Sequence, residues 1–205
     1  MRGGQEAVSP GTLHIEGDWS HAAFYLVAGA IGRGEIRLTG LDPQSAQGDR
    51  AVVEILRDMG ADIRWEGSAL VSRASRLHGL RVDCAQIPDL VPILAVAMAA
   101  AEGDSRITGT ARLRIKESDR LSAMAAALTA AGADAAELPD GLAIRGGKTL
   151  HAAKIEGCND HRIVMAMTIA SALSDGEWTI TDAEATAKSA PAFWQEFERL
   201  GGRAR

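Results

Sequence analysis

The chain of 205 residues carries 22 Lys and Arg against 27 Asp and Glu, a formal net charge of -5, which disfavours a nucleic-acid-binding surface. The apolar run at 92–100 is too short to cross a bilayer, so no membrane association is predicted. Cys84 and Cys158 lack the spacing of a metal site or redox motif, and both are predicted to be reduced, buried thiols in a cytoplasmic protein.

Six predicted elements follow one another in the first part of the chain. They are a strand at 12–17, a helix at 20–32, a strand at 35–41, a helix at 49–60, and short strands at 61–67 and 69–75. The helices are predicted from apolar residues at helical spacing, and the strands from short apolar or alternating runs between turn residues.

The same order of elements then recurs. The second set has a strand at 79–87, a helix at 89–103, a strand at 105–111, a helix at 119–132, and strands at 133–139 and 141–147. The third set has a strand at 150–157, a helix at 161–175, a strand at 177–183 and a helix at 190–202. In each set the last helix runs into a glycine (Gly60, Gly132 or Gly201), which is typical of a helix C-terminus.

This alternation predicts an α/β fold made of three repeat units, at about 13–76, 77–147 and 148–205, after a flexible tail at 1–12. The third unit lacks its final pair of strands. Either the fold tolerates that loss, or another piece of polypeptide completes the unit.

Four basic residues fall where strands are predicted to lead into helices: Lys116, Arg120, Arg162 and Lys188. The partial positive charge of a helix N-terminus disfavours cations, so these positions call for an explanation. N-capping explains other polar residues at these junctions, but not the bases. The predicted caps are Asp18, Ser20, Asp49, Asn159 and Ser189. Each base alone is also compatible with a solvated surface residue. Together they predict a site for phosphate and carboxylate groups.

Three further residues at these junctions could move protons. Asp89 and Glu117 are candidates for general base and general acid, and His161 for a proton carrier or a hydrogen-bond donor to an anion. Glu117 is equally explained by an ion pair with Arg120, and Asp89 by a helix cap. The sequence has no zinc-protease, nucleophile-elbow, dinucleotide-binding or P-loop motif, so neither a metal nor an organic cofactor is predicted.

Five collinear motifs resemble one enzyme family. They are GDWSHAAFYLVAGAI at 17–31, QIPDLVPILAVAMAAAEG at 86–103, LRIKESDR at 113–120, NDHRIVMAM at 159–167 and TAKSAPAFW at 186–194. At these positions and spacings, the chain from about residue 13 to its end resembles the C-terminal half of the EPSP synthase (3-phosphoshikimate 1-carboxyvinyltransferase) family. The resemblance implies a domain of three βαβαββ units arranged as an inside-out barrel, with the third unit incomplete here.

The resemblance also implies a reaction. Members of the family transfer the enolpyruvyl group of phosphoenolpyruvate to the 5-hydroxyl of shikimate 3-phosphate, and need no metal or cofactor. By motif, Asp89 matches the acid that accepts the hydroxyl proton, Glu117 the acid near the methylene carbon, and His161 a residue lining the pocket. The motifs match four residues to substrate binding: Lys116 to shikimate 3-phosphate, and Arg120, Arg162 and Lys188 to phosphoenolpyruvate.

The family's N-terminal portion has no counterpart in this sequence. It carries the other substrate-binding Lys and Arg and a Ser-rich phosphate clamp, so the chain is expected to hold half an active site. We therefore expect it to be weakly active or inactive alone, with a separate N-terminal domain or fragment as a candidate partner. Two alternatives stay open: the sister enolpyruvyltransferase acting on UDP-N-acetylglucosamine, which the motifs fit less well, and a non-catalytic binding or complementation module.

Overall fold

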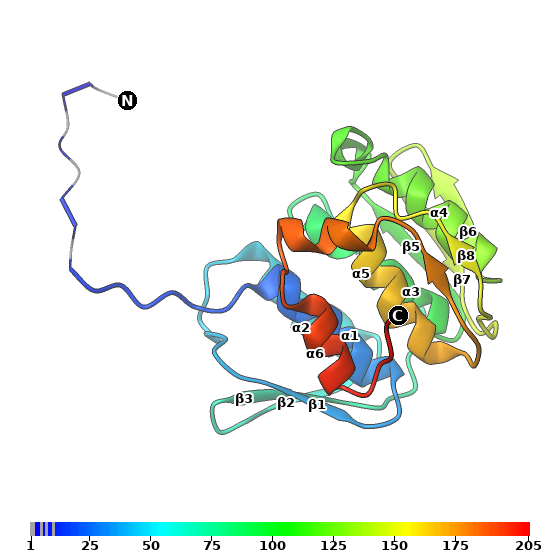
Figure 1. Ribbon diagram of the computed structural model, residues 1–205, viewed down its shortest axis with the longest axis horizontal. Coiled ribbons are helices and arrows are strands. Elements are labelled where there is room, and N and C mark those ends of the chain that lie inside the picture. The colour runs from blue at the N-terminus through cyan, green and yellow to red at the C-terminus, as the bar shows by residue number, and fades with distance from the viewer. Residues whose placement is uncertain (1–2, 5, 7, 10) are drawn as a thin grey trace.

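The computed structural model describes residues 3–4, 6, 8–9 and 11–205. Of the predicted tail at 1–12, residues 1, 2, 5, 7 and 10 lie outside the described part. The chain at residues 11–17 projects away from the folded body and joins it at the first helix (Figure 1).

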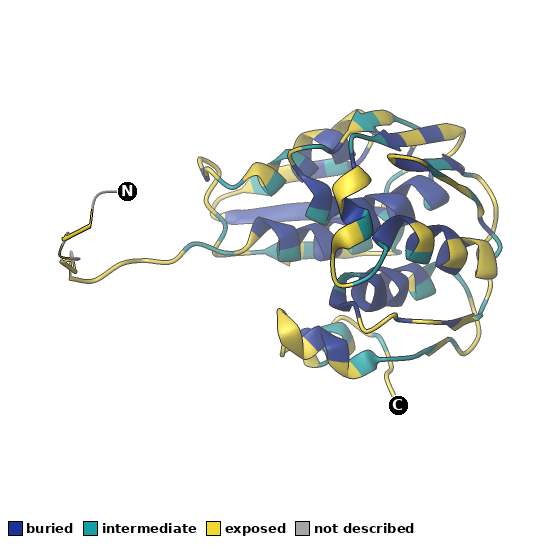
Figure 2. Ribbon diagram, turned by 90° about the horizontal axis from the view of Figure 1, so that it is seen from above, coloured by how far each residue is buried: buried dark blue, intermediate teal, exposed yellow. Residues whose placement is uncertain are grey.

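Three helices form the centre of the molecule. They are α1 (Trp19–Ile31), α3 (Val91–Ala100) and α5 (His161–Ala170), and they pack against one another. Their residues are mostly buried on every side (Figure 2), as expected for helices that are apolar all round. The predicted helices at these positions are confirmed, although α3 and α5 end earlier than their apolar runs.

The strands form three small sheets around these helices. The first holds β1 (Glu35–Leu38), β3 (Ala69–Arg73) and β2 (Asp62–Glu66), in that order and antiparallel. The second has the order β4 (Arg81–Asp83), β5 (Asp104–Thr108), β7 (Gly141–Arg145) and β6 (Asp134–Leu138), in which β4 and β5 are parallel. The third pairs β8 (Lys154–Ile155) with β9 (Thr179–Ile180) in parallel. The fold is therefore mixed α/β, as predicted.

Three further helices complete the set: α2 (Val52–Asp58), α4 (Arg120–Ala130) and α6 (Phe193–Arg199). Short 3-10 helices precede or follow the α-helices: η1 (Gly48–Ala51), η2 (Pro88–Leu90), η3 (Ala111–Ile115), η4 (Ser171–Leu173) and η5 (Ala183–Lys188). Within the described residues, no helix is both long and apolar enough to span a membrane. Cys84 is buried, as predicted, but Cys158 is exposed, so its predicted burial is wrong.

Helix α1 lies directly against β3 because Gly29 has no side chain. A Cβ atom at Gly29 would come within 2.7 Å of the Ser72 carbonyl oxygen. The buried Ser72 hydroxyl donates a hydrogen bond of 2.7 Å to the Leu26 carbonyl, which ties the strand to the helix. This contact fixes α1, and with it the residues at its N-terminus.

The predicted strand at 12–17 is wrong. These residues belong to no strand, and Leu13 and Ile15 are 67% and 81% exposed. Their one backbone hydrogen bond to the neighbouring connection runs from the Gly17 N–H to the Gly40 carbonyl at 2.8 Å. An alternating pattern shows that a segment can form a strand, but it does not supply a partner edge.

Candidate active site

The N-terminal ends of several helices are brought together, and three aspartates cap them. Asp18 caps α1, Asp119 caps α4 and Asp160 caps α5, each by accepting hydrogen bonds from backbone N–H groups of the first turn. The sequence suggested Asn159 as the cap of α5, but the cap is the next residue. These caps set where the charged residues of each junction lie.

Arg120 is the centre of the site. It is the first residue of α4 and is only 1% exposed. Its Nε lies 2.8 Å from Asp160 Oδ2, its Nη1 3.0 Å from Asp89 Oδ1, and its Nη2 2.7 Å from Glu117 Oε2. Ser118 adds a hydroxyl hydrogen bond of 3.0 Å to Asp160. A buried guanidinium thus joins carboxylates from three separate elements.

Asp160 is completely buried and remains charged. Burial alone would raise the pKa of its carboxyl group, but the hydrogen bonds and charge of Arg120, with the Arg162 N–H, hold that pKa below its ordinary value. The buried pair therefore consists of a carboxylate and a guanidinium, not of two neutral groups.

Arg162 links α5 to η2 and α1. Its Nη2 donates to Asp89 Oδ2 at 3.2 Å and to the Ser20 hydroxyl at 3.1 Å, and its Nη1 donates to the Asp89 carbonyl at 3.1 Å. Lys116 also approaches Asp89, with Nζ 3.9 Å from Oδ1. Asp89 is consequently shared by three cations, and it is not a helix cap, because the N-cap residues of η2 and α3 are Ile87 and Leu90.

His161 lies beside this cluster. Its Nδ1 is 3.9 Å from Glu117 Oε1 and has no hydrogen-bond partner among the described residues. Burial, together with the charge of Arg162, lowers the pKa of its imidazole, so the ring is neutral at neutral pH. A neutral, unpartnered ring nitrogen can accept or donate a proton to a bound group.

Lys188 has a different setting from the other bases. It is the last residue of η5, and α6 begins only at Phe193, so the prediction that it stands at a helix N-terminus is wrong. The Ala- and Thr-rich residues before it coil into a 3-10 helix, which moves the helix start. Its Nζ donates to the Asn159 carbonyl at 2.5 Å and to Asn159 Oδ1 at 2.9 Å.

Lys116 likewise precedes its helix, since α4 begins four residues later at Arg120. Only Arg120 and Arg162 lie in the first turn of a helix. Even so, the contacts above link six of the seven predicted site residues. They are Asp89, Glu117, His161, Lys116, Arg120 and Arg162. The structure brings these residues together, but Lys116 and Lys188 do not stand at a helix N-terminus, so the electrostatic reason given for these two bases is wrong.

Sequence reasoning missed Asp160, Ser20 and Asn159 as contacts of the predicted bases. Asp160 lies inside the NDHR motif. The sequence pattern that could have identified it is an aspartate beside basic residues at the start of a predicted helix. Ser20 and Asn159 had a sufficient explanation as caps. No sequence pattern indicates that their oxygens face Arg162 and Lys188.

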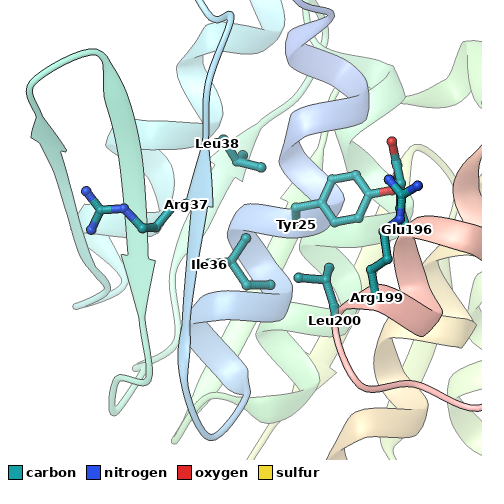
Figure 3. Close-up of a pocket in the computed structure, with 7 residues that line it drawn as sticks. All are labelled: Tyr25, Ile36, Arg37, Leu38, Glu196, Arg199 and Leu200. Atoms are coloured by element: carbon teal, nitrogen blue, oxygen red, sulfur yellow. The ribbon is translucent and has the colours of Figure 1, made fainter.

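A small pocket of about 20 Å³ adjoins this cluster. It is lined by Asp18, Ser20, His21, Phe24, His161, Arg162, Met165 and Ser189. A larger groove, of about 220 Å³, lies between α1, β1 and α6 (Figure 3). In Figure 3 the side chains of Ile36, Leu38 and Leu200 face Tyr25 across this groove, and none of its lining residues belongs to the charged cluster. We therefore place the candidate site at the charged cluster because of the chemistry of its side chains, although the groove has the larger volume.

The described His, Cys, Asp and Glu side chains form no group of three or more that could hold a metal ion. What the cluster does offer is three carboxylates and three bases in contact, a fourth base nearby, and a neutral histidine. This set can bind an anion and exchange protons with it.

Comparisons with known proteins agree with this chemistry. The family model of EPSP synthase (3-phosphoshikimate 1-carboxyvinyltransferase) matches residues 1–197. The 3-phosphoshikimate 1-carboxyvinyltransferase of Clostridium novyi is 43% identical over 202 residues, which are 98% of this chain and 46% of that protein. Its counterpart in Clostridium acetobutylicum is 46% identical over 92% of this chain and 43% of that protein.

Solved structures give the same result. An EPSP synthase from Acinetobacter baumannii aligns with a TM-score of 0.77 and 33% identity, over 90% of this chain and 46% of its own. The enolpyruvyl transferase NikO from Streptomyces tendae aligns with a TM-score of 0.73 at 18% identity, which shows a shared fold alone. The chain spans about half the length of the curated relatives it matches, and it belongs to the EPSP synthase family.

Proposed function

We propose that the chain supplies one half of the active site for transfer of the enolpyruvyl group from phosphoenolpyruvate to the 5-hydroxyl of shikimate 3-phosphate. The observation that carries the proposal is the sharing of Asp89 among Lys116, Arg120 and Arg162. It couples the candidate proton acceptor to the candidate anion-binding residues in one cluster.

In this proposal Asp89 accepts the proton of the attacking hydroxyl. Three cationic side chains lie within 3.0–3.9 Å of its carboxylate oxygens, and a carboxylate oxygen can accept the proton of a hydroxyl group. Glu117, on the other side of Arg120, is the acid that acts at the methylene carbon of phosphoenolpyruvate. His161 supplies a neutral ring nitrogen 3.9 Å from the Glu117 carboxylate. Lys116, Arg162 and Lys188 bind phosphate and carboxylate groups of the substrates.

Arg120 requires a change of partner to bind substrate. Its guanidinium already contacts Asp160, Asp89 and Glu117. Asp160 is buried, whereas the side chains of Asp89 and Glu117 are 33% and 38% exposed. A substrate anion would therefore compete with Asp89 and Glu117 for Arg120, and binding would release those two carboxylates for chemistry.

The proposal includes the architecture that the resemblance implies. The chain comprises three units of the βαβαββ type at about 13–76, 77–147 and 148–205 after a tail at 1–12. The first unit lacks its opening strand in the structure, and the third lacks its final pair of strands. The two-stranded β8–β9 sheet, beside sheets of three and four strands, supports this division. A cytoplasmic setting and an N-terminal domain or fragment as partner belong to the same proposal.

The test is reconstitution of turnover. Phosphate release from phosphoenolpyruvate and shikimate 3-phosphate is measured for the chain alone and for the chain mixed with the N-terminal half of the Clostridium novyi relative. We expect little or no release by the chain alone, and release in the mixture that is lost when Asp89→Asn is used. Normal turnover by the chain alone would contradict the half-site proposal.

Calorimetry distinguishes the proposed enzyme half-site from a non-catalytic module. If the folded chain binds neither anion at millimolar concentration and the mixture stays inactive, a non-catalytic binding or complementation module becomes the better description. Turnover with UDP-N-acetylglucosamine in place of shikimate 3-phosphate would instead indicate the sister reaction.

A further inference from the structure

Lys188 differs from the other predicted substrate-binding residues in its partners. Lys116, Arg120 and Arg162 each contact the carboxylate of Asp89. No carboxylate of residues 3–4, 6, 8–9 or 11–205 lies within 4.0 Å of the Lys188 ammonium. Its two partners are the backbone carbonyl and the side-chain Oδ1 of Asn159, which are both neutral.

The backbone around Asn159 is held in an unusual conformation. Cys158, Asn159 and Asp182 have φ angles of 54°, 50° and 57°, and no other non-glycine residue of the described chain has a positive φ. They meet at one place, since the Asn159 N–H donates to Asp182 Oδ2 at 2.9 Å. Left-handed backbone at non-glycine residues is strained, and such strain gathers where a function requires it.

The strained turn at Asn159 determines which atoms contact Lys188. It directs the carbonyl oxygen and the side-chain oxygen of the same residue to one ammonium group. Asn tolerates the left-handed conformation better than most residues and also carries the second oxygen. Ser189, the next residue after Lys188, lines the small pocket together with Arg162 and His161. The ammonium is thus fixed beside the anion-binding end of α5.

We propose that Asn159 is the positioning residue of Lys188: it fixes the ammonium with two neutral acceptors, so that the charge stays uncompensated for a substrate anion. The inference rests on the proposed function, because it concerns the same site. A carboxylate at position 159 would hold the ammonium equally well, but it would cancel the charge that an anion needs.

The first experiment measures how accessible the Lys188 amine is. The chain is treated with an amine-acetylating reagent, and acetylation of each lysine is quantified by mass spectrometry. Asn159→Gly keeps the left-handed backbone and the carbonyl but removes Oδ1. We expect it to raise acetylation of Lys188 about fivefold, because one hydrogen bond no longer holds the nitrogen. Acetylation of Lys154 should not change.

A neighbouring variant serves as the matched control. Cys158→Gly relieves strain at the adjacent left-handed residue but leaves both Asn159 oxygens in place. It should leave Lys188 acetylation within about twofold of the parent chain, since both hydrogen bonds persist. Unchanged acetylation in Asn159→Gly, or an equal rise in Cys158→Gly, would overturn the proposal.

The second experiment tests the role of the neutral partner. Phosphoenolpyruvate should protect Lys188 of the parent chain from acetylation, and should protect the Asn159→Asp variant about tenfold less well. Equal protection of the two chains, or no protection of either, would overturn the inference that the charge is kept for an anion. If this protection pattern holds but the reconstituted mixture shows no turnover, the proposed reaction fails while the positioning role stands.

Discussion

At the scale of single residues, Arg120 has the most demanding environment in the site. Its side chain is 1% exposed, and its partner Asp160 is fully buried. Removing charges from water is costly, and the pair recovers that cost through its close hydrogen bonds. Loss of Arg120 would leave Asp160 buried without a charge partner, whereas loss of Asp160 would leave Arg120 paired with Asp89 and Glu117.

We expect Arg120→Ala to lower the free energy of unfolding by about 3–5 kcal/mol, because Asp160 would keep a buried, uncompensated charge. Urea denaturation measures the change. Arg64→Ala is the matched control: Arg64 is 72% exposed and pairs with Asp62 at 2.6 Å. An exposed pair contributes less than about 1 kcal/mol. Similar losses in the two variants would show that burial does not govern the Arg120 interactions.

At the scale of secondary-structure elements, the site depends on where helices begin. The Asp18 side chain accepts hydrogen bonds from the Ser20 and His21 N–H groups at 2.8 and 3.4 Å, which starts α1 at Trp19. Ser20, in that first turn, accepts a hydrogen bond from Arg162 of α5. A cap on one helix therefore also holds a substrate-binding candidate on another.

Asp18→Ala should destabilise the chain by about 1 kcal/mol through loss of the cap. Thermal or urea unfolding would detect the loss, and the exposed Asp175→Ala serves as the control with an expected change within about 0.5 kcal/mol. The Asp18→Asn and Asp18→Ser variants should retain most of the stability, because both residues are effective caps. A full loss in Asp18→Asn would point to the charge of Asp18 and not to capping.

The elements themselves were largely predictable, and the contacts between them were not. Runs such as 92–100 are apolar all round, and this pattern alone indicates a buried helix. The strand predicted at 12–17 failed because alternation carries no information about a partner edge. The Arg120–Asp160 pair joins residues 40 positions apart. Only the packing of α4 against α5 brings them together, so the sequence offered Glu117 as a partner but not Asp160.

At the scale of the whole molecule, the buried His161 and the partly buried His21 couple folding to pH. Burial lowers the pKa of His21 and of His161 from the ordinary value of 6.5. Well above pH 6.5 both rings are neutral in the folded and the unfolded chain, so there they do not make the free energy of unfolding depend on pH. Below 6.5 the unfolded chain binds protons that the folded chain does not, and stability is lost as the pH falls towards the folded-state pKa values.

We therefore expect the free energy of unfolding to fall between about pH 7 and about pH 5, by at most about 1.4 kcal/mol per pH unit for each histidine. Urea denaturation across this range gives the slope. His161→Gln should make the slope shallower, whereas His14→Gln, at an exposed position, should leave it unchanged. An unaltered slope in His161→Gln would contradict the conclusion that His161 contributes to the pH dependence of stability.

The outer edge of β1 has a consequence for how the chain behaves in concentrated solution. Among the described strands β1 pairs only with β3, so its other edge presents free backbone groups beside the apolar groove lined by Ile36, Leu38 and Leu200. Such an edge is a template for sheet growth between molecules. The charges of Glu35 and Arg37 on the same strand act as gatekeepers against aggregation. Their replacement by neutral residues would promote aggregation while leaving the folded structure intact.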